Sequence, residues 1–183
     1  GLSNSGDYFV AMMLKELHNE GFNNVIVNSN PSSVTFDPEL AEKRYVEPAT
    51  IENILQILRI EQPQYLFIPT SYDKLLKSLQ NYDLDVKIIV IPDELPTTAA
   101  SSDKQRYFFN YVYDGNYAYP LGTMTDLFSP IALNYQSTAL RYPADLPSST
   151  YQNLNDQASV AVLKMEQPGL YQVIFEENDG EFN

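Results

Sequence analysis

Three short apolar runs separated by helix-like segments constrain the fold of the first ninety residues more than any other feature. The runs span residues 24–27, 65–68 and 86–91, and the last is almost continuously apolar. A segment with apolar residues at helical spacing precedes each run, and the three segments span 7–20, 50–63 and 71–81. Short buried strands that alternate with amphipathic helices are typical of crossover units in a parallel sheet. The sequence therefore predicts a doubly wound α/β layer.

The composition changes after Pro92 to segments rich in Pro, Ser and Tyr. This change predicts a boundary within 96–102, with an α/β domain over 1–96 and a smaller, diverged α+β segment over 97–183. In the second segment we expect a helix over 103–112 and two strands, 159–165 and 170–176, joined by a turn at 167–169.

The charge balance and two scarce residue types exclude several classes of function. Eleven Lys and Arg against 24 Asp and Glu give a formal net charge of −13, which repels phosphodiester backbones and excludes nucleic acid as a partner. The absence of cysteine excludes disulfides and thiolate nucleophiles, and the single histidine, His18, leaves no His-rich metal site. No apolar run approaches the roughly 18 residues of a membrane span, so no membrane partner is expected.

Polar residues follow the first predicted strand at the edge where such sheets bind ligands. Asn28, Asn30 and Pro31 combine two side-chain amides with a proline-fixed turn, and Glu47 follows a little further along the chain. On their own, asparagine and proline after a strand are ordinary turn residues.

The order of several short motifs resembles the large chain of carbamoyl-phosphate synthetase, in the domain that precedes its ATP-grasp module. The motifs are Asp7-Tyr8, Leu14-Lys15-Glu16-Leu17, Gly21-Phe22, Val27 to Pro31, Asp37-Pro38-Glu39, Tyr45-Val46-Glu47-Pro48 and Glu61-Gln62-Pro63. The resemblance covers residues 5–70 well and extends more weakly to about residue 110. It implies a three-layer, Rossmann-like pre-ATP-grasp domain, and it favours a cytoplasmic location.

The chain also departs from that family. Where the family has a Gly-Gly-Gln-Thr turn after its third strand, this sequence has Pro69-Thr70-Ser71-Tyr72 and lacks the glycines that let a ligand approach the backbone. The family's first strand should stand before Gly1. After residue 110 the glycines are isolated, and Arg141 and Lys164 are the remaining basic residues, so the sequence predicts no phosphate cradle there.

The resemblance implies that the whole enzyme makes carbamoyl phosphate from bicarbonate, glutamine-derived ammonia and ATP, for arginine or pyrimidine synthesis. ATP and magnesium are cofactors of that family, and none is expected in this chain by itself. We expect a non-catalytic chain that scaffolds an ATP-grasp module or another synthetase subunit, with Asn28, Asn30, Pro31 and Glu47 at the interface.

Two alternatives stay open at this point, as does the oligomeric state. The chain could be a stand-alone protein that binds a ligand or partner at the same strand ends. Alternatively, residues 97–183 could be a truncated ATP-grasp remnant that completes a reduced ATP site, with Asp156, Glu166 and Glu176 as magnesium ligands. The spacing of these three carboxylates does not favour the reduced site.

Overall fold

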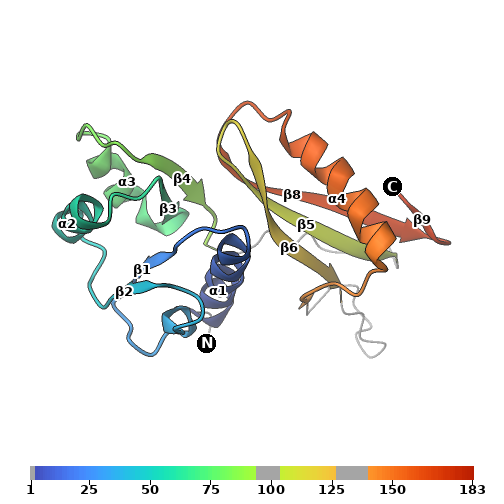
Figure 1. Cartoon of the computed structure of the whole chain (residues 1–183), viewed down its shortest axis with the longest axis horizontal. Coiled ribbons are helices and arrows are strands. Elements are labelled where there is room, and N and C mark those ends of the chain that lie inside the picture. Colours follow the sequence, from blue (N-terminus) through green and yellow to red (C-terminus); the bar gives the residue numbers. More distant parts are fainter. Residues whose placement is uncertain (1–2, 94–103, 127–139) are drawn as a thin grey trace. The chain divides into compact units, whose positions relative to one another are not determined.

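The computed structural model describes residues 3–93, 104–126 and 140–183. These residues belong to two compact units, Gly1–Leu95 and Pro96–Asn183 (Figure 1). The boundary expected within 96–102 lies outside the described residues. No helix in the described ranges combines the length and the apolar character that a bilayer crossing requires.

The first unit alternates helices with short strands, as the sequence predicts. In chain order its elements are α1 (Ser3–Asn19), β1 (Val25–Val27), η1 (Val34–Phe36), β2 (Lys43–Tyr45), α2 (Ile51–Glu61), β3 (Tyr65–Pro69), η2 (Thr70–Tyr72), α3 (Asp73–Leu79) and β4 (Lys87–Ile91). The predicted helices and apolar strands are therefore confirmed, and so is the α/β class. The sequence missed β2, whose residues form no apolar run.

The strands described in the first unit form two parallel pairs. β1 pairs with β2, and β3 pairs with β4. Val27 from the first pair and Ile68 from the second pack in one apolar cluster with Ile54 of α2 and Leu79 of α3. The two pairs and these helices therefore share a core.

Capping residues fix the ends of α2 where the sequence places them. The Thr50 side chain accepts a hydrogen bond from the Asn53 backbone N–H, as an N-cap does. Gln62 adopts the left-handed conformation (φ 46°) and ends the helix directly before Pro63.

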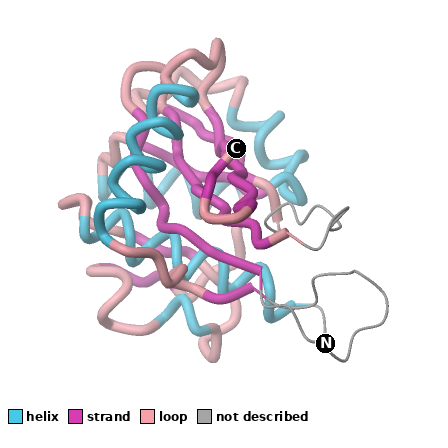
Figure 2. The backbone as a smooth tube through the Cα atoms, turned by 90° about the vertical axis from the view of Figure 1, so that its right-hand side faces the viewer, coloured by secondary structure: helices cyan, strands magenta, loops and turns pink. Residues whose placement is uncertain are grey.

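In its described residues, the second unit is an antiparallel sheet with a helix packed against one face. Its elements are β5 (Gln105–Tyr113), β6 (Ala118–Asp126), β7 (Leu140–Arg141), α4 (Ser148–Val162), β8 (Gly169–Asn178) and β9 (Glu181–Phe182). The strand order is β7-β6-β5-β8-β9. Figure 2, with strands in magenta, shows the C-terminus beside the strands, in keeping with the pairing of β8 with β9.

Alternate side chains of β5 form the core of the second unit with α4. Tyr107, Phe109, Tyr111 and Tyr113 lie on one face of the strand, and they pack against apolar residues one helical turn apart on α4: Leu154, Ala158 and Val162. The Tyr111 hydroxyl donates to the Asn155 side chain (2.6 Å) and to its backbone carbonyl (3.0 Å).

Two predictions for the second unit are wrong. Residues 105–112 of the predicted helix 103–112 lie in the strand β5, because this segment pairs along its length with β6 and β8. The predicted strand 159–165 lies largely in α4, so the turn at 167–169 follows a helix and does not join two strands. The strand predicted over 170–176 is confirmed within β8.

Candidate functional site

The predicted site residues lie at the carboxyl edge of the β1–β2 pair. The Asn28 backbone N–H donates to the Tyr45 carbonyl (3.1 Å), which brings the end of β1 beside the end of β2. Glu47 is exposed two residues beyond β2. Residues from both strand ends therefore share one edge of the first unit.

The two asparagines use their side chains to shape the loop after β1. The Asn28 carboxamide oxygen accepts from the Asn30 backbone N–H (2.9 Å), and the Asn30 oxygen accepts from the Ser32 N–H (3.0 Å). Pro31 lies exposed between these turns. Consecutive Asx turns of this kind hold the loop in one shape, with Asn30 exposed at its surface.

A buried hydroxyl network ties this loop to α1. The Ser33 hydroxyl donates to the Asp7 carboxylate (2.8 Å) and lies 2.8 Å from the Thr35 hydroxyl. Thr35 is 1% exposed, and the Asn28 side chain approaches its hydroxyl at 3.5 Å. The network positions the start of α1 at the carboxyl edge of β1.

A second polar cluster lies at the carboxyl edge of the β3–β4 pair, and sequence reasoning missed it. Asp93 accepts hydrogen bonds from the Thr70 hydroxyl (2.6 Å), the Ser71 backbone N–H (3.0 Å) and the Ser71 hydroxyl. The hydrogen bonds from Ser71 and then Thr70 lower the pKa of Asp93. The sequence contained one signal for this cluster. Asp93 stands two positions after the apolar strand β4, at the edge of the sheet where Thr70 and Ser71 follow β3.

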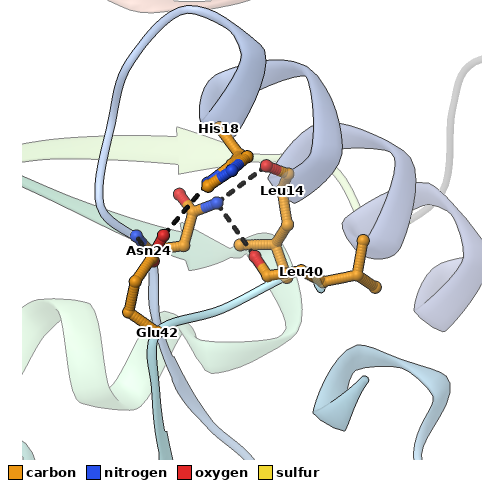
Figure 3. Close-up of polar contacts among 5 residues, drawn as sticks. All are labelled: Leu14, His18, Asn24, Leu40 and Glu42. Atoms are coloured by element: carbon orange, nitrogen blue, oxygen red, sulfur yellow. Dashed lines mark hydrogen bonds and ion pairs between the residues drawn. The ribbon is translucent and has the colours of Figure 1, made fainter. Parts of the chain in front are cut away.

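The opposite, amino edge of β1 and β2 is held by Asn24 (Figure 3). Its side-chain N–H₂ donates to the Leu14 carbonyl (2.7 Å) and the Leu40 carbonyl (3.0 Å), and its backbone N–H donates to Glu42. His18 Nδ1 lies 3.0 Å from Glu42 Oε1. Burial acts to raise the pKa of Glu42, but hydrogen bonds from its own backbone, Asn24 and His18 outweigh burial and lower it.

The end of α2 is joined to β2 by another carboxylate. Glu61 accepts from the Lys43 ammonium (2.7 Å) and from the Tyr45 hydroxyl. The hydrogen bond from Lys43, followed by that from Tyr45, lowers the pKa of Glu61. This carboxylate therefore stabilises the packing of α2 against β2.

These contacts define what the strand ends can do chemically. The carboxylates of Asp7 and Asp93 already accept hydrogen bonds from neighbouring hydroxyls. Within the described parts of the chain, no three acidic or histidine side chains are placed to hold a metal ion, a finding that includes Asp156, Glu166 and Glu176.

The second unit has a shallow hollow of its own. Its volume is about 380 Å³, and it lies between α4 and the β8–β9 turn, lined by Ser149, Thr150, Asn153, Leu154, Gln157, Gly180 and Phe182. The lining has no ionisable side chain.

Comparison with known proteins assigns the first unit. Residues 1–91 match the family model described as the carbamoyl phosphate synthase pre-ATP-grasp domain. Through these residues, the chain belongs to that family. The resemblance seen in the sequence motifs is thereby confirmed.

Curated relatives carry the name carbamoyl phosphate synthase large chain. The chain is 34% identical to that of Buchnera aphidicola over 93 residues, which are 50% of this chain and 9% of the relative. It is 46% identical to that of Acidobacterium capsulatum over 61 residues, 33% of this chain and 6% of the relative. An Aquifex aeolicus protein named as the N-terminal section of the large chain is 41% identical over 64 residues, 35% of this chain and 11% of the relative. The match thus spans about a tenth or less of the length of these relatives.

Proposed function

We propose that residues 1–91 act as a non-catalytic wall against which an ATP-grasp module closes, in a protein related to the carbamoyl phosphate synthase large chain. In this role the two parallel pairs belong to one three-layer, Rossmann-like domain. Its carboxyl edge faces the module, and Asn28, Asn30, Pro31 and Glu47 supply contacts there.

The observation that carries this proposal is the family match, which covers residues 1–91 and is to the domain preceding ATP-grasp. The geometry supports it, because the two loop asparagines fix the shape of the edge and the Asp93 carboxylate accepts hydrogen bonds from Thr70 and Ser71. A loop whose shape is fixed by its own hydrogen bonds suits a docking surface, since little side-chain entropy is lost on binding.

By family relation, we propose that the complete protein contributes to carbamoyl phosphate synthesis from bicarbonate, glutamine-derived ammonia and ATP, which feeds arginine or pyrimidine synthesis. ATP and magnesium would act in the ATP-grasp module. We further propose a cytoplasmic location on the same ground.

A second candidate function is favoured by the separate core of the second unit. Its sheet and α4 form a compact body outside the matched residues. A stand-alone protein that binds a small ligand or a partner at the strand ends of the first unit would also carry such a body.

A titration with magnesium–ATP tests the non-catalytic assignment. We expect no heat in calorimetry and no change in Tm, because residues 1–91 would not hold the nucleotide. Micromolar binding would instead raise the apparent stability, by about 2.7 kcal/mol at a hundredfold excess over Kd, and would overturn the assignment.

The docking role is tested by titration with an ATP-grasp partner, which also separates the two candidate functions.

A further inference from the structure

In the described residues of the second unit, the outer edge of β8 is open over most of its length. One edge of β8 pairs with β5 over residues 169–177, whereas β9 covers only the C-terminal end of the other edge (Figure 1). The last contact between these two strands is a pair of backbone hydrogen bonds, both 3.1 Å long, that Glu176 exchanges with Asn183. The stretch from Gly169 to Phe175 therefore has a free edge.

The hydrogen bonds of Glu176 show which backbone groups point to the free edge. In an antiparallel ladder, the N–H and C=O of one residue point to the same side, and those of the next residue point to the opposite side. Since Glu176 is bonded outward, the backbone groups of Leu170, Gln172 and Ile174 also point outward. Among the described residues, no backbone hydrogen bond uses these outward groups. They form the row of donors and acceptors that a further strand needs.

This edge lacks the features that normally stop a strand from pairing with another chain, which are charged residues, proline and bulges. The stretch from Gly169 to Phe175 has neither a charged residue nor a proline, although the chain has a formal net charge of −13. Its register with β5 is unbroken. On the other side of β5, by contrast, β6 carries Pro120 and a register shift between Phe109 and Tyr111. The open edge of β8 is therefore suited to strand pairing.

The free edge is complementary to a second copy of itself. Because Asn183 covers Glu176, an antiparallel strand uses the whole free edge when a two-fold axis passes Gln172. This register places Leu170 of one copy opposite Ile174 of the other, and Ile174 is 37% exposed without such a partner. Glu176 falls opposite Pro168 of the other copy, so no two carboxylates face each other across the new ladder.

We propose that the chain forms a two-fold symmetric dimer through this edge, with β8 of each copy antiparallel to β8 of the other. About six backbone hydrogen bonds join the two sheets into one. Interfaces of this kind, in which the same surface is used by both subunits, are the commonest in soluble oligomers. The interface lies outside residues 1–91 and does not depend on the proposed function.

Amide exchange in the unaltered 183-residue chain tests the pairing. The N–H groups of Leu170, Gln172 and Ile174 are bonded in the dimer and face water in the monomer. We expect their exchange to slow at least about tenfold as the protein concentration rises from below to above the dimer Kd, which sedimentation equilibrium measures. The N–H groups of Tyr171 and Val173 point to β5, so their exchange should change less and serves as an internal control.

Two double variants test the register. Leu170→Lys with Ile174→Lys places like charges opposite each other across the two-fold axis, which destabilises a ladder. Leu170→Glu with Ile174→Lys alters the same two positions but places opposite charges there. We expect the dimer Kd of the first variant to exceed that of the second at least about tenfold, a change of 1.4 kcal/mol.

Three results would overturn the proposal. The first is a chain that stays monomeric in light scattering up to about 1 mM, which would leave the edge to an extended segment of another protein. The second is a dimer in which the outward amides exchange as fast as in the monomer, because another surface would then hold it. The third is an equal Kd for the two folded double variants. If neither variant folds, the concentration dependence of exchange in the unaltered chain decides.

Discussion

Asn24 offers the sharpest test of how the first unit is held together. Replacing it by aspartate (Asn24→Asp) keeps the size of the side chain but removes both donors to the Leu14 and Leu40 carbonyls. It also places a second carboxylate beside Glu42. Asn24 is 6% exposed, so water cannot replace the lost partners.

The expected cost follows from these contacts. Two hydrogen bonds contribute about 1 kcal/mol each, and leaving buried acceptors unsatisfied costs about 1–3 kcal/mol more. We therefore expect Asn24→Asp to lower the free energy of unfolding by about 3–5 kcal/mol. For a domain of this size that corresponds to a fall in Tm of about 10 °C or more.

The effect is measured by thermal and urea unfolding at pH 7. Circular dichroism and tyrosine fluorescence monitor both transitions. The matched control is Asn23→Asp, which adds the same charge at the exposed neighbouring position. The deficit relative to this control should shrink in acid, because a protonated carboxyl group can again donate one hydrogen bond. Equal stability of the two variants at pH 7 would refute the role assigned to Asn24.

Three further predictions concern the remaining polar contacts. The hydrogen bonds from Ser71 and Thr70 lower the pKa of Asp93, so its contribution, at most about 1 kcal/mol for an exposed carboxylate, is present above pH ~4 and lost as pH falls through the folded pKa. Asp93→Asn should therefore be less stable than the parent at pH 7, and the difference should shrink as the pH falls below that range. A difference that stays constant with pH would contradict this. Tyr111→Phe should cost about 1–2 kcal/mol in urea unfolding, since its hydroxyl donates to Asn155, whereas Tyr117→Phe, at a side chain 64% exposed, should cost nothing measurable. Burial, followed by the effect of Glu177, raises the pKa of Tyr107 to about 12. The contribution of Tyr107 to the stability of the fold is therefore complete below pH ~10 and lost as pH rises to about 12. Phenolate absorbance that develops fully near pH ~10 without unfolding would contradict this.

The first unit was predictable because its elements have a local signal. Apolar residues repeat at helical spacing in α1 and α2, and Lys87–Ile91 is almost continuously apolar. β2 has no such signal, because Lys43 and Arg44 are exposed and the strand is defined by its backbone pairing with β1.

The second unit was harder to predict because distant pairing decides its structure. The apolar run from Tyr107 to Tyr113 is compatible with a helix or a strand, and hydrogen bonds to β6 and β8 on both sides settle it as β5. In α4, the apolar residues Leu154, Ala158 and Val162 do recur at helical spacing, but the polar residues between them weaken the pattern.

The sequence predicts the candidate site only within single loops, and not the contacts between loops. Asn28 and Asn30 identify a turn from their residue types alone, and the structure places both in one loop. The contact of Asp93 with Thr70 and Ser71 depends on the parallel pairing of β3 with β4, which brings together residues that are far apart in the sequence.

Calorimetric titration with an ATP-grasp partner tests the central claim most directly. The partner is an ATP-grasp module of a carbamoyl phosphate synthase large chain, prepared without the domain that precedes it. We expect saturable one-to-one binding that Glu47→Lys weakens at least about tenfold, a change of 1.4 kcal/mol, while Glu20→Lys, the same exchange beyond the far end of α1, leaves it unchanged. Absence of saturable binding, or equal weakening by the two variants, would contradict a docking role for the carboxyl edge.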